Sequence, residues 1–326
     1  MKKRKVLITG AAGYIGSILT RLLLDKGYFV IGLDNLRFGG ESLLELFNKD
    51  NFKFINADIR DGSRLDKIVK DISFVIHLAA IVGDPACRQE PELAKEVNLY
   101  ASKELYEIAN KKGVERFIFA STCSNYGNMV DNNGYVSEES PLKPVSLYAK
   151  TKVEVEKYLL EQNRDNACLP VILRFATVYG ISPRMRFDLT VNEFTRELAL
   201  GKELVIYGEQ FWRPYCHVVD LARSVVLAIE SPKEKVAFDV FNVGDTSENY
   251  QKKMIVSELL KFFPKAKIKY VHRDEDPRDY RVSFEKIKKR LGFKITKRVS
   301  DGILQIKKAL EKGIITNPYD SRYKNV

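Results

Sequence analysis

Short apolar segments alternate with amphipathic segments along the first half of the chain. The apolar segments have the length of buried strands. Between the first two, five apolar side chains from Ile15 to Leu23 recur at helical spacing, and Gly27 follows where a helix would end. This alternation is typical of a doubly wound parallel α/β sheet. The predicted strands are Lys5–Thr9, Tyr28–Leu33, Phe52–Asn56, Phe74–Leu78, Arg116–Ala120 and Val171–Phe175, and the predicted helices are Tyr14–Lys26, Pro91–Lys112 and Tyr148–Glu161.

The pattern changes after residue 175, where shorter elements replace the regular alternation. We expect a loop at Gly180–Met185, helices at Asp188–Leu200 and Asp220–Ile229, and strands at Val205–Tyr207 and Val240–Val243. These elements predict a second, smaller lobe of mixed α/β structure. We place the larger lobe at residues 1–178, with residues 215–245 returning to it, and the smaller lobe at residues 179–214 and 246–326.

Composition narrows the class of protein. Of the 326 residues, 45% are hydrophobic and 30% charged, as in a globular protein, and no apolar run is long enough to span a bilayer. The net charge of +11 lies mostly after residue 231. Such an excess suits an anionic small molecule as well as nucleic acid. The basic run at residues 286–290 has no interleaved aromatic residues, so we expect a small-molecule partner, no nucleic acid and no membrane.

The cysteines and histidines exclude two further kinds of site. Four cysteines are scattered without a C-x-x-C pair, and three histidines lie far apart. A chain of this length needs no disulfides, so we expect reduced thiols in a cytoplasmic protein. The histidines lack the spacing of metal ligands, so we expect no metal.

A glycine-rich turn follows the first predicted strand and opens the first helix. Its glycines are Gly10, Gly13 and Gly16. Without side chains, the turn lets a pyrophosphate approach the backbone N–H groups at the helix N-terminus. This context favours a dinucleotide over a plain strand–helix connection.

Acidic residues after the second and third strands support a dinucleotide. Asp34 stands where a carboxylate would accept hydrogen bonds from the adenosine ribose and repel a 2′-phosphate, which favours NAD over NADP. Arg37 weakens that preference, because a guanidinium accommodates such a phosphate. Asp58 lies where it would meet the adenine edge, although an aspartate in a surface turn explains it almost as well.

A tyrosine and a lysine lie one helical turn apart at Tyr148 and Lys152. A free phenol is a poor base at neutral pH, but a neighbouring ammonium favours the phenolate and lowers its pKa. The pair is then suited to removing a proton from a sugar hydroxyl. A polar segment, residues 121–127, follows the strand Arg116–Ala120 at the edge where open α/β sheets bind ligands.

Taken in order, these motifs resemble the extended short-chain dehydrogenases/reductases, in particular the NAD-dependent nucleotide-sugar epimerases and dehydratases. The resemblance covers essentially the whole chain and implies a Rossmann fold. It is carried by the three glycines of the turn, Asp34, Asp58, His77-Leu-Ala-Ala80, Asn98, Ser121-Thr122, Tyr126-Gly127 and Tyr148-x-x-x-Lys152.

The resemblance implies specific roles. Thr122 would bind the reacting hydroxyl, Tyr148 would act as acid and base, and Lys152 would activate the tyrosine and contact the nicotinamide ribose. His77 is assigned a structural role. The implied NAD contacts are Gly10, Gly13, Tyr14, Ile15, Gly16, Asp34, Asn35, Asp58, Ile59, Leu78, Ala79, Ala80, Tyr148 and Lys152.

The resemblance also bears on the reaction. Family members that eliminate water have Asp-Glu directly after the Thr122 position, whereas this chain has Cys123-Ser124, which disfavours 4,6-dehydration. Cys123 is either an acid/base or, by preference, a small packed thiol. Redox chemistry at C4 remains, through a 4-keto intermediate. The product is then either a 4-epimer or, in a net dehydrogenase, the ketone itself.

The substrate implied is a nucleotide-diphosphate sugar, whose charge suits two arginine forks. The residues expected at it are Cys123, Ser124, Arg184, Asn192, Arg213 and Arg278. Surface salt bridges are the alternative explanation of the arginines. The strings Ile181–Arg186 and Arg278–Tyr280 also resemble a GDP-manno-heptose 4-dehydrogenase. The family further implies a homodimer formed through Pro91–Lys112 and Tyr148–Glu161. A non-catalytic dinucleotide-binding sensor is the competing class.

Overall fold

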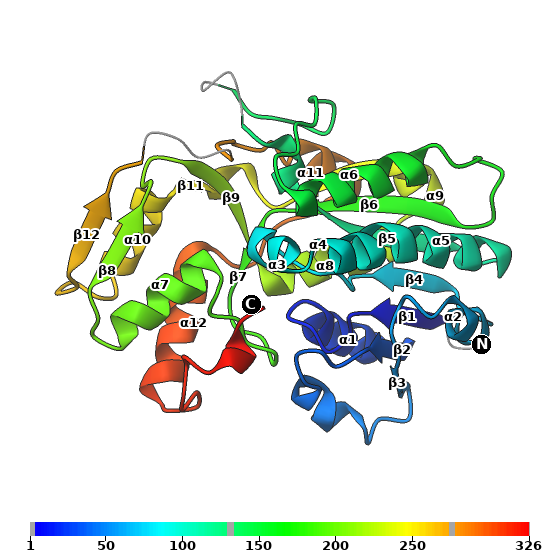
Figure 1. Ribbon diagram of the computed structural model, residues 1–326, viewed down its shortest axis with the longest axis horizontal. Coiled ribbons are helices and arrows are strands. Elements are labelled where there is room, and N and C mark those ends of the chain that lie inside the picture. Colours follow the sequence, from blue (N-terminus) through cyan, green and yellow to red (C-terminus); the bar gives the residue numbers. More distant parts are fainter. Residues whose placement is uncertain (1–3, 129–133, 274–277, 326) are drawn as a thin grey trace.

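Seven parallel strands form the main sheet of the computed structural model, which describes residues 4–128, 134–273 and 278–325. Their order is β10-β6-β5-β4-β1-β2-β3 (Figure 1). All six strands predicted in the first half are present, and a strand from later in the chain, β10, pairs with β6 at one edge. The bounds are β1 Lys5–Thr9, β2 Phe29–Asp34, β3 Phe52–Asn56, β4 Phe74–His77, β5 Arg116–Thr122, β6 Leu169–Phe175 and β10 Asp239–Val243.

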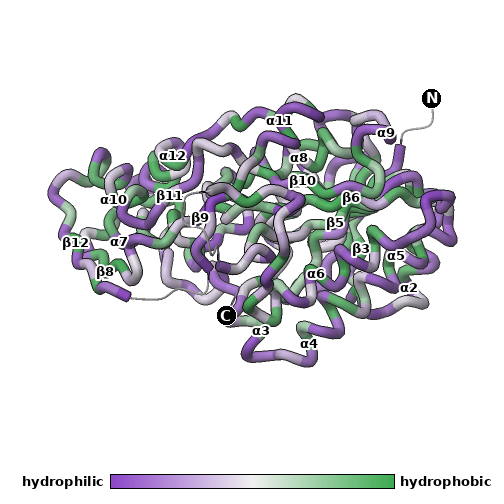
Figure 2. The backbone as a smooth tube through the Cα atoms, turned by 90° about the horizontal axis from the view of Figure 1, so that it is seen from above, coloured by the Kyte–Doolittle hydropathy of each residue, from purple (hydrophilic) through white to green (hydrophobic). Residues whose placement is uncertain are grey.

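Helices cover both faces of this sheet because successive strand residues point to opposite sides. Val6 and Ile8 of β1 pack in one apolar cluster, whereas Leu7 packs in another. The first cluster lies under α1 (Gly16–Asp25), α8 (Val218–Glu230) and α11 (Glu285–Leu291), and the second under α2 (Gly62–Ile68), α5 (Ala101–Lys111) and α6 (Leu147–Leu160). The residues of β5 and β6 are mostly hydrophobic (Figure 2), and most of them are buried. The predicted doubly wound α/β fold is confirmed.

The long helix predicted at Pro91–Lys112 is interrupted. It consists of α4 (Pro91–Lys95), a π-helical turn η2 (Glu96–Tyr100) and α5. Asn98, in the π-helical turn, accepts a hydrogen bond from the Ile81 N–H (2.8 Å) and donates one to the Ile81 carbonyl (2.9 Å). The register change thus turns this amide towards the segment that follows β4, which periodicity alone does not reveal.

The smaller lobe is mixed, as predicted, and it lies at one end of the molecule in Figure 1. One small sheet has the order β11-β9-β7 and another pairs β12 with β8. β7, β9, β11 and β12 were not predicted. β9 carries arginine, proline and histidine, so it lacks the alternation of a half-buried strand. The bounds are β7 Thr177–Tyr179, β8 Leu204–Tyr207, β9 Trp212–His217, β11 Asn249–Gln251, β12 Ile268–Val271, α7 Thr190–Ala199, α10 Lys252–Leu260 and α12 Val299–Glu311.

Short helical segments complete the described chain: η1 Glu41–Leu46, α3 Asp84–Gln89, η3 Cys123–Tyr126, α9 Lys233–Val236, η4 Thr246–Glu248 and η5 Ser321–Tyr323. Among the described residues, no helix is both long and apolar enough to cross a bilayer.

Candidate functional site

The glycine turn between β1 and α1 has room only for glycine at two positions. Gly10 has φ of 75°, and a Cβ there would lie 2.9 Å from the Ala79 nitrogen. A Cβ on Gly16 would lie 2.0 Å from the Gly10 carbonyl oxygen. The turn therefore packs tightly against the segment after β4, and no side chain caps the N-terminus of α1 at Ile15. This arrangement fits the pyrophosphate of a dinucleotide.

Asp34 ends β2 and fastens the next loop to the turn. One carboxylate oxygen accepts a hydrogen bond from the Ala12 N–H (3.0 Å) and the other from the Leu36 N–H (2.9 Å). Burial raises the pKa of this carboxyl. The Arg37 guanidinium is paired with Glu90. Because Arg37 is paired with Glu90, it does not pair with Asp34. The Asp34 carboxylate is thus the acidic group at the end of β2, where a ribose would lie.

The predicted adenine-side residues lie beside Asp34. Asn35 donates to the Asp58 carboxylate (3.1 Å), and Arg60 donates to the same carboxylate at 3.0 and 3.1 Å. These bonds to Arg60 are the main reason that the pKa of Asp58 falls to about 2. Ile59 is buried.

His77 holds the end of β4 in place. Its Nδ1 lies 2.7 Å from the Thr9 hydroxyl and its Nε2 lies 2.8 Å from the Ser102 hydroxyl. Burial lowers the pKa of His77 to about 3, so the ring is neutral. Leu78, Ala79 and Ala80 follow it and bring their backbone to the glycine turn. The geometry is that of a structural histidine.

Lys152 and Tyr148 lie on α6, whose first turn is capped by Ser146. The Lys152 Nζ donates to the Ala120 carbonyl of β5 (2.9 Å) and lies 5.9 Å from the centre of the Tyr148 ring. Lys152 is only 1% exposed, and burial lowers its pKa to about 8. Thr122 ends β5, and its hydroxyl accepts a hydrogen bond from the Ser124 N–H (3.1 Å). Lys152 thus joins the tyrosine to the strand end that carries Thr122.

The pKa of Tyr148 differs from the expectation. We expected the ammonium to lower it, but the pKa is raised, chiefly because burial removes the phenol from water. Cys87 and Asp84 raise it further, and the Arg186 charge lowers it. In the protein alone, desolvation therefore outweighs the nearby cations.

Three groups that face Tyr148 were not predicted as site residues. Asp84 and Cys87 belong to α3, and Arg186 belongs to the loop after β7. Arg186 is held by a two-pronged ion pair with Asp188, at 2.9 and 2.7 Å. The arginine-rich string Ile181–Arg186 was the one signal for this loop, and nothing in the local pattern marks Asp84.

Two predicted substrate residues are turned into the protein interior. Cys123 is 1% exposed, its thiol donates to the Arg174 carbonyl (3.3 Å), and burial raises its pKa well above the usual value. Asn192 is fully buried, and its amide binds the Gly180 N–H, the Tyr14 hydroxyl and the Arg186 carbonyl. Both residues therefore support the loops around the site, and their substrate contacts stay predictions.

Of the remaining predicted substrate residues, Ser124 and Arg213 lie near Tyr280. The Ser124 hydroxyl lies 3.5 Å from the Tyr280 hydroxyl, and the Arg213 guanidinium lies 5.4 Å from the centre of the Tyr280 ring. Arg278 reaches across to Asp84, with 3.0 Å between the charged atoms. Thus one predicted phosphate ligand already contacts α3 beside Tyr148.

Arg184 is a buried cation near the glycine turn. It donates to the Lys324 carbonyl (3.1 Å) and stacks over Phe38 at 4.6 Å from the ring centre. Burial lowers its pKa to about 10, and its Nε has no hydrogen-bond partner among the described residues.

The described residues contain no group of three or more His, Cys, Asp or Glu side chains that could hold a metal ion.

Comparison with known proteins gives a consistent picture. The sequence model of the NAD dependent epimerase/dehydratase family matches residues 6–244. UDP-glucose 4-epimerase of Bacillus subtilis (strain 168) is 30% identical over 317 residues, which cover 88% of this chain and 91% of that protein.

Solved structures agree along nearly the whole chain. UDP-glucose 4-epimerase from Thermotoga maritima with UDP-glucose superposes with a TM-score of 0.83 at 28% identity, over 95% of this chain and 99% of that one. UDP-glucuronic acid 4-epimerase from Bacillus cereus, in complex with UDP-glucuronic acid and NAD, gives a TM-score of 0.81 at 28% identity, over 94% and 99%.

Proposed function

Because this chain belongs to the NAD dependent epimerase/dehydratase family, we propose that it is an NAD-dependent epimerase acting at C4 of a nucleotide-diphosphate sugar through a 4-keto intermediate. The family consists of enzymes, and its cofactor is NAD. One observation carries the assignment to this site. Lys152 contacts both the β5 strand end that leads to Thr122 and the ring of Tyr148, within the sheet edge lined by the glycine turn.

The proposed chemistry divides between these residues. Bound NAD supplies the acceptor, and later the donor, of a hydride. Tyr148 takes the C4 hydroxyl proton and returns it, Thr122 orients the hydroxyl, and Lys152 stabilises the phenolate. Because the pKa of Tyr148 is raised in the protein alone, the phenolate needs the positive charges of the assembled site. Reduction on the opposite face of the ketone gives the 4-epimer, whereas escape of the ketone gives net oxidation.

The interior position of Cys123 supports epimerisation over dehydration. Elimination of water across C5 and C6 needs a further acid and base next to Thr122. The next residue is a buried thiol whose pKa is raised well above its usual value, and Ser124 follows it. Neither side chain is suited to that proton transfer at neutral pH.

We place the substrate between the two lobes. We assign the diphosphate to Arg213 and Arg278, since guanidinium groups bind phosphates through two parallel hydrogen bonds. The main sheet and its glycine turn would hold NAD, and residues 179–214 and 246–326 would hold the sugar nucleotide. UDP-glucose and UDP-glucuronate are the first substrates to test, because the similar solved structures contain UDP-glucose and UDP-glucuronic acid.

We further propose a cytoplasmic homodimer. The four cysteines are free buried thiols, which suits a reducing compartment. α5 and α6 lie side by side on one face of the sheet and would form the contact. Sedimentation should give twice the mass of one chain.

A panel of sugar nucleotides tests the function. UDP-glucose, UDP-glucuronate, dTDP-glucose and GDP-mannose are each incubated with the protein and NAD, and the products are followed by mass spectrometry and NMR. Unchanged mass with a new set of sugar proton signals marks epimerisation, and loss of two hydrogens marks oxidation. Tyr148→Phe should abolish turnover, whereas Tyr207→Phe, at the far end of the smaller lobe, should not. Undiminished turnover by Tyr148→Phe would refute the mechanism.

A further inference from the structure

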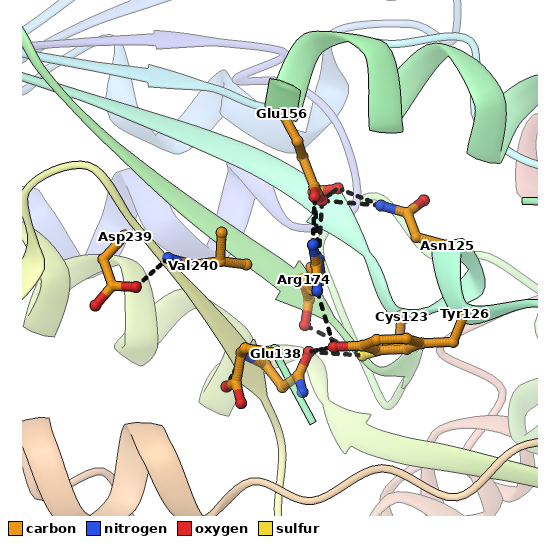
Figure 3. Close-up of polar contacts among 10 residues, drawn as sticks. Cys123, Asn125, Tyr126, Glu138, Glu156, Arg174, Asp239 and Val240 are labelled. Carbon is orange, nitrogen blue, oxygen red and sulfur yellow. Dashed lines mark hydrogen bonds and ion pairs between the residues drawn. The ribbon is translucent and has the colours of Figure 1, made fainter. Parts of the chain in front are cut away.

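A buried ion pair joins α6, the helix of Tyr148 and Lys152, to β6 (Figure 3). Glu156 of α6 and Arg174 of β6 have side chains only 1% and 5% exposed. The Arg174 Nε lies 3.1 Å from both Glu156 carboxylate oxygens, and its Nη2 lies 2.6 Å from one of them. Charges this deeply buried are costly unless they are fully paired, as these are.

The Glu156 carboxylate joins the two elements that carry the proposed catalytic residues. It stands one helical turn after Lys152 and two after Tyr148, on the same side of α6. It also accepts hydrogen bonds from Ser121, the residue before Thr122, and from the Asn125 amide (2.8 Å). One carboxylate therefore fixes α6 against the end of β5.

Arg174 anchors this carboxylate to the rest of the core. Its Nη1 donates to the Tyr126 hydroxyl (2.9 Å), which donates to the Asn242 side-chain oxygen (2.8 Å). The Asn242 N–H in turn donates to Glu138 (2.7 Å). Both side chains are buried and bonded to other residues of the protein interior. The pair therefore does not touch the substrate and acts on the reaction only through other residues.

We propose that Glu156 and Arg174 form a positioning pair, which sets α6 against β5 so that Tyr148, Lys152 and Thr122 keep their mutual geometry, and which keeps Lys152 protonated. This inference rests on the proposed function, because it assigns the work to the Tyr148–Lys152 pair. Stability alone gives little reason for such a pair, since well-packed apolar residues often replace one without loss.

The charge around Lys152 supports the second part of the proposal. Its Nζ donates to the Ala120 carbonyl and lies 4.6 Å from the centre of the Phe119 ring and 5.9 Å from that of the Tyr148 ring. The other titratable groups that interact with it electrostatically are the neutral His77, Cys87 of α3 and Glu156. Burial lowers the pKa of Lys152 to about 8, while Cys87 and Glu156 oppose that fall. Glu156 is the carboxylate among these groups, and its negative charge favours the protonated form of Lys152. Without that charge, the Lys152 ammonium would lose its proton at a lower pH.

The titration of Lys152 measures this directly, without NAD or substrate. The Lys152 Cε signal is followed by NMR against pH in the cofactor-free protein and is assigned by its absence from Lys152→Met. In Glu156→Gln we expect the midpoint to fall by about one pH unit, because a missing neighbouring charge changes a pKa by that order. With NAD and UDP-glucose, kcat should fall about tenfold on the alkaline side, with KM nearly unchanged.

Two further variants keep the result decisive. Glu248→Gln removes an equally buried carboxylate, 2.7 Å from Arg298 in the other lobe, and should leave the Lys152 midpoint and kcat as in the wild type. If Glu156→Gln does not fold, the double variant Glu156→Leu with Arg174→Met replaces the pair with apolar side chains. A wild-type Lys152 midpoint and kcat in either folded variant would overturn the proposal. Undiminished turnover by Tyr148→Phe would instead overturn the proposed function.

Discussion

At the residue scale, burial determines the behaviour of the side chains that the reaction needs. Lys152 is buried and Tyr148 is half-buried, and desolvation shifts each pKa towards the neutral form: down for the lysine and up for the tyrosine. The folded chain therefore bears the cost of a buried ammonium. In the proposed mechanism the same ammonium stabilises the negative charge that develops on Tyr148.

Replacing Lys152 should consequently make the protein more stable and inactive. A lysine whose pKa falls from 10.5 to about 8 on folding costs about 3 kcal/mol at neutral pH. The cost is full below pH 8 and shrinks as the pH rises from 8 towards 10.5. Lys152→Met also leaves the Ala120 carbonyl without its partner, so we expect a net gain of about 1–2 kcal/mol in the free energy of unfolding.

Denaturant unfolding of Lys152→Met at pH 7 and at pH 10 measures this. The gain should be smaller at pH 10, and turnover should be lost. Lys150→Met, an exposed neighbour on the same helix, should change neither stability nor rate appreciably. A less stable Lys152→Met at pH 7 would contradict the account.

The two unpredicted charges near Tyr148 should have opposite effects on the pH dependence of the rate. Asp84 raises the pKa of Tyr148 and Arg186 lowers it. Since proton removal requires the phenolate, Asp84→Asn should move the acidic limb of the kcat profile to lower pH, and Arg186→Gln should move it to higher pH. Movement of both limbs in the same direction would show that these charges act by another route.

At the element scale, helix α6 determines the catalytic geometry. Tyr148 is the second residue of α6, so it lies in the first turn, where helices fray most easily. The Ser146 hydroxyl accepts a hydrogen bond from the Ala149 N–H (3.2 Å) and closes this turn. Further along, Lys152 and Glu156 fasten the same helix to β5. A cap that serves stability in most helices therefore also holds the catalytic phenol.

Removal of that cap should affect both stability and rate. We expect Ser146→Ala to lower the free energy of unfolding by about 1 kcal/mol, the usual worth of an N-cap. Because Tyr148 loses its fixed position, kcat should fall as well. Asp61→Ala removes the N-cap of α2, where the carboxylate accepts a hydrogen bond from the Arg64 N–H, and should leave kcat unchanged. Thermal unfolding and initial rates measure the two effects, and an unaltered kcat in Ser146→Ala would refute the link.

At the scale of the whole molecule, the glycine turn and the smaller lobe are connected through Tyr14. Its hydroxyl donates to the Gly180 carbonyl and accepts from the Asn192 amide (3.0 Å), and the Ser182 hydroxyl donates to the Tyr14 carbonyl (2.7 Å). The loop after β7 also carries Arg184 and Arg186. These hydrogen bonds thus join the glycine turn, which we propose binds NAD, to the loop that carries the two arginines.

Tyr14→Phe should weaken this connection. The Gly180 carbonyl and the Asn192 amide each lose the Tyr14 hydroxyl as a hydrogen-bond partner. We expect this loss to lower the free energy of unfolding by about 1–3 kcal/mol. NAD affinity, measured by calorimetry, should fall, because the turn loses its support. Tyr28→Phe removes a partly exposed hydroxyl 3.4 Å from Glu230 and serves as the control. Wild-type NAD affinity in Tyr14→Phe would contradict the coupling.

The sequence by itself determined the features that depend on local spacing. Strand length, helical periodicity and the glycine turn predicted the first six strands in place. The order of motifs predicted the family, NAD and C4 redox chemistry, and the comparisons confirm these predictions. The pairing of Tyr148 with Lys152 belongs to this group, because residues four apart share a helical face wherever the helix lies.

The tertiary structure alone decided which polar groups reach the site. Cys123 and Asn192 stand at promising positions in the sequence, yet packing turns both into the interior. Asp84 and Arg186 come from segments distant from Tyr148 in the sequence and act on it only in the folded protein. The raised pKa of Tyr148 likewise depends on burial. Burial and long-range charge arise from contacts between elements, which no local pattern of residues encodes.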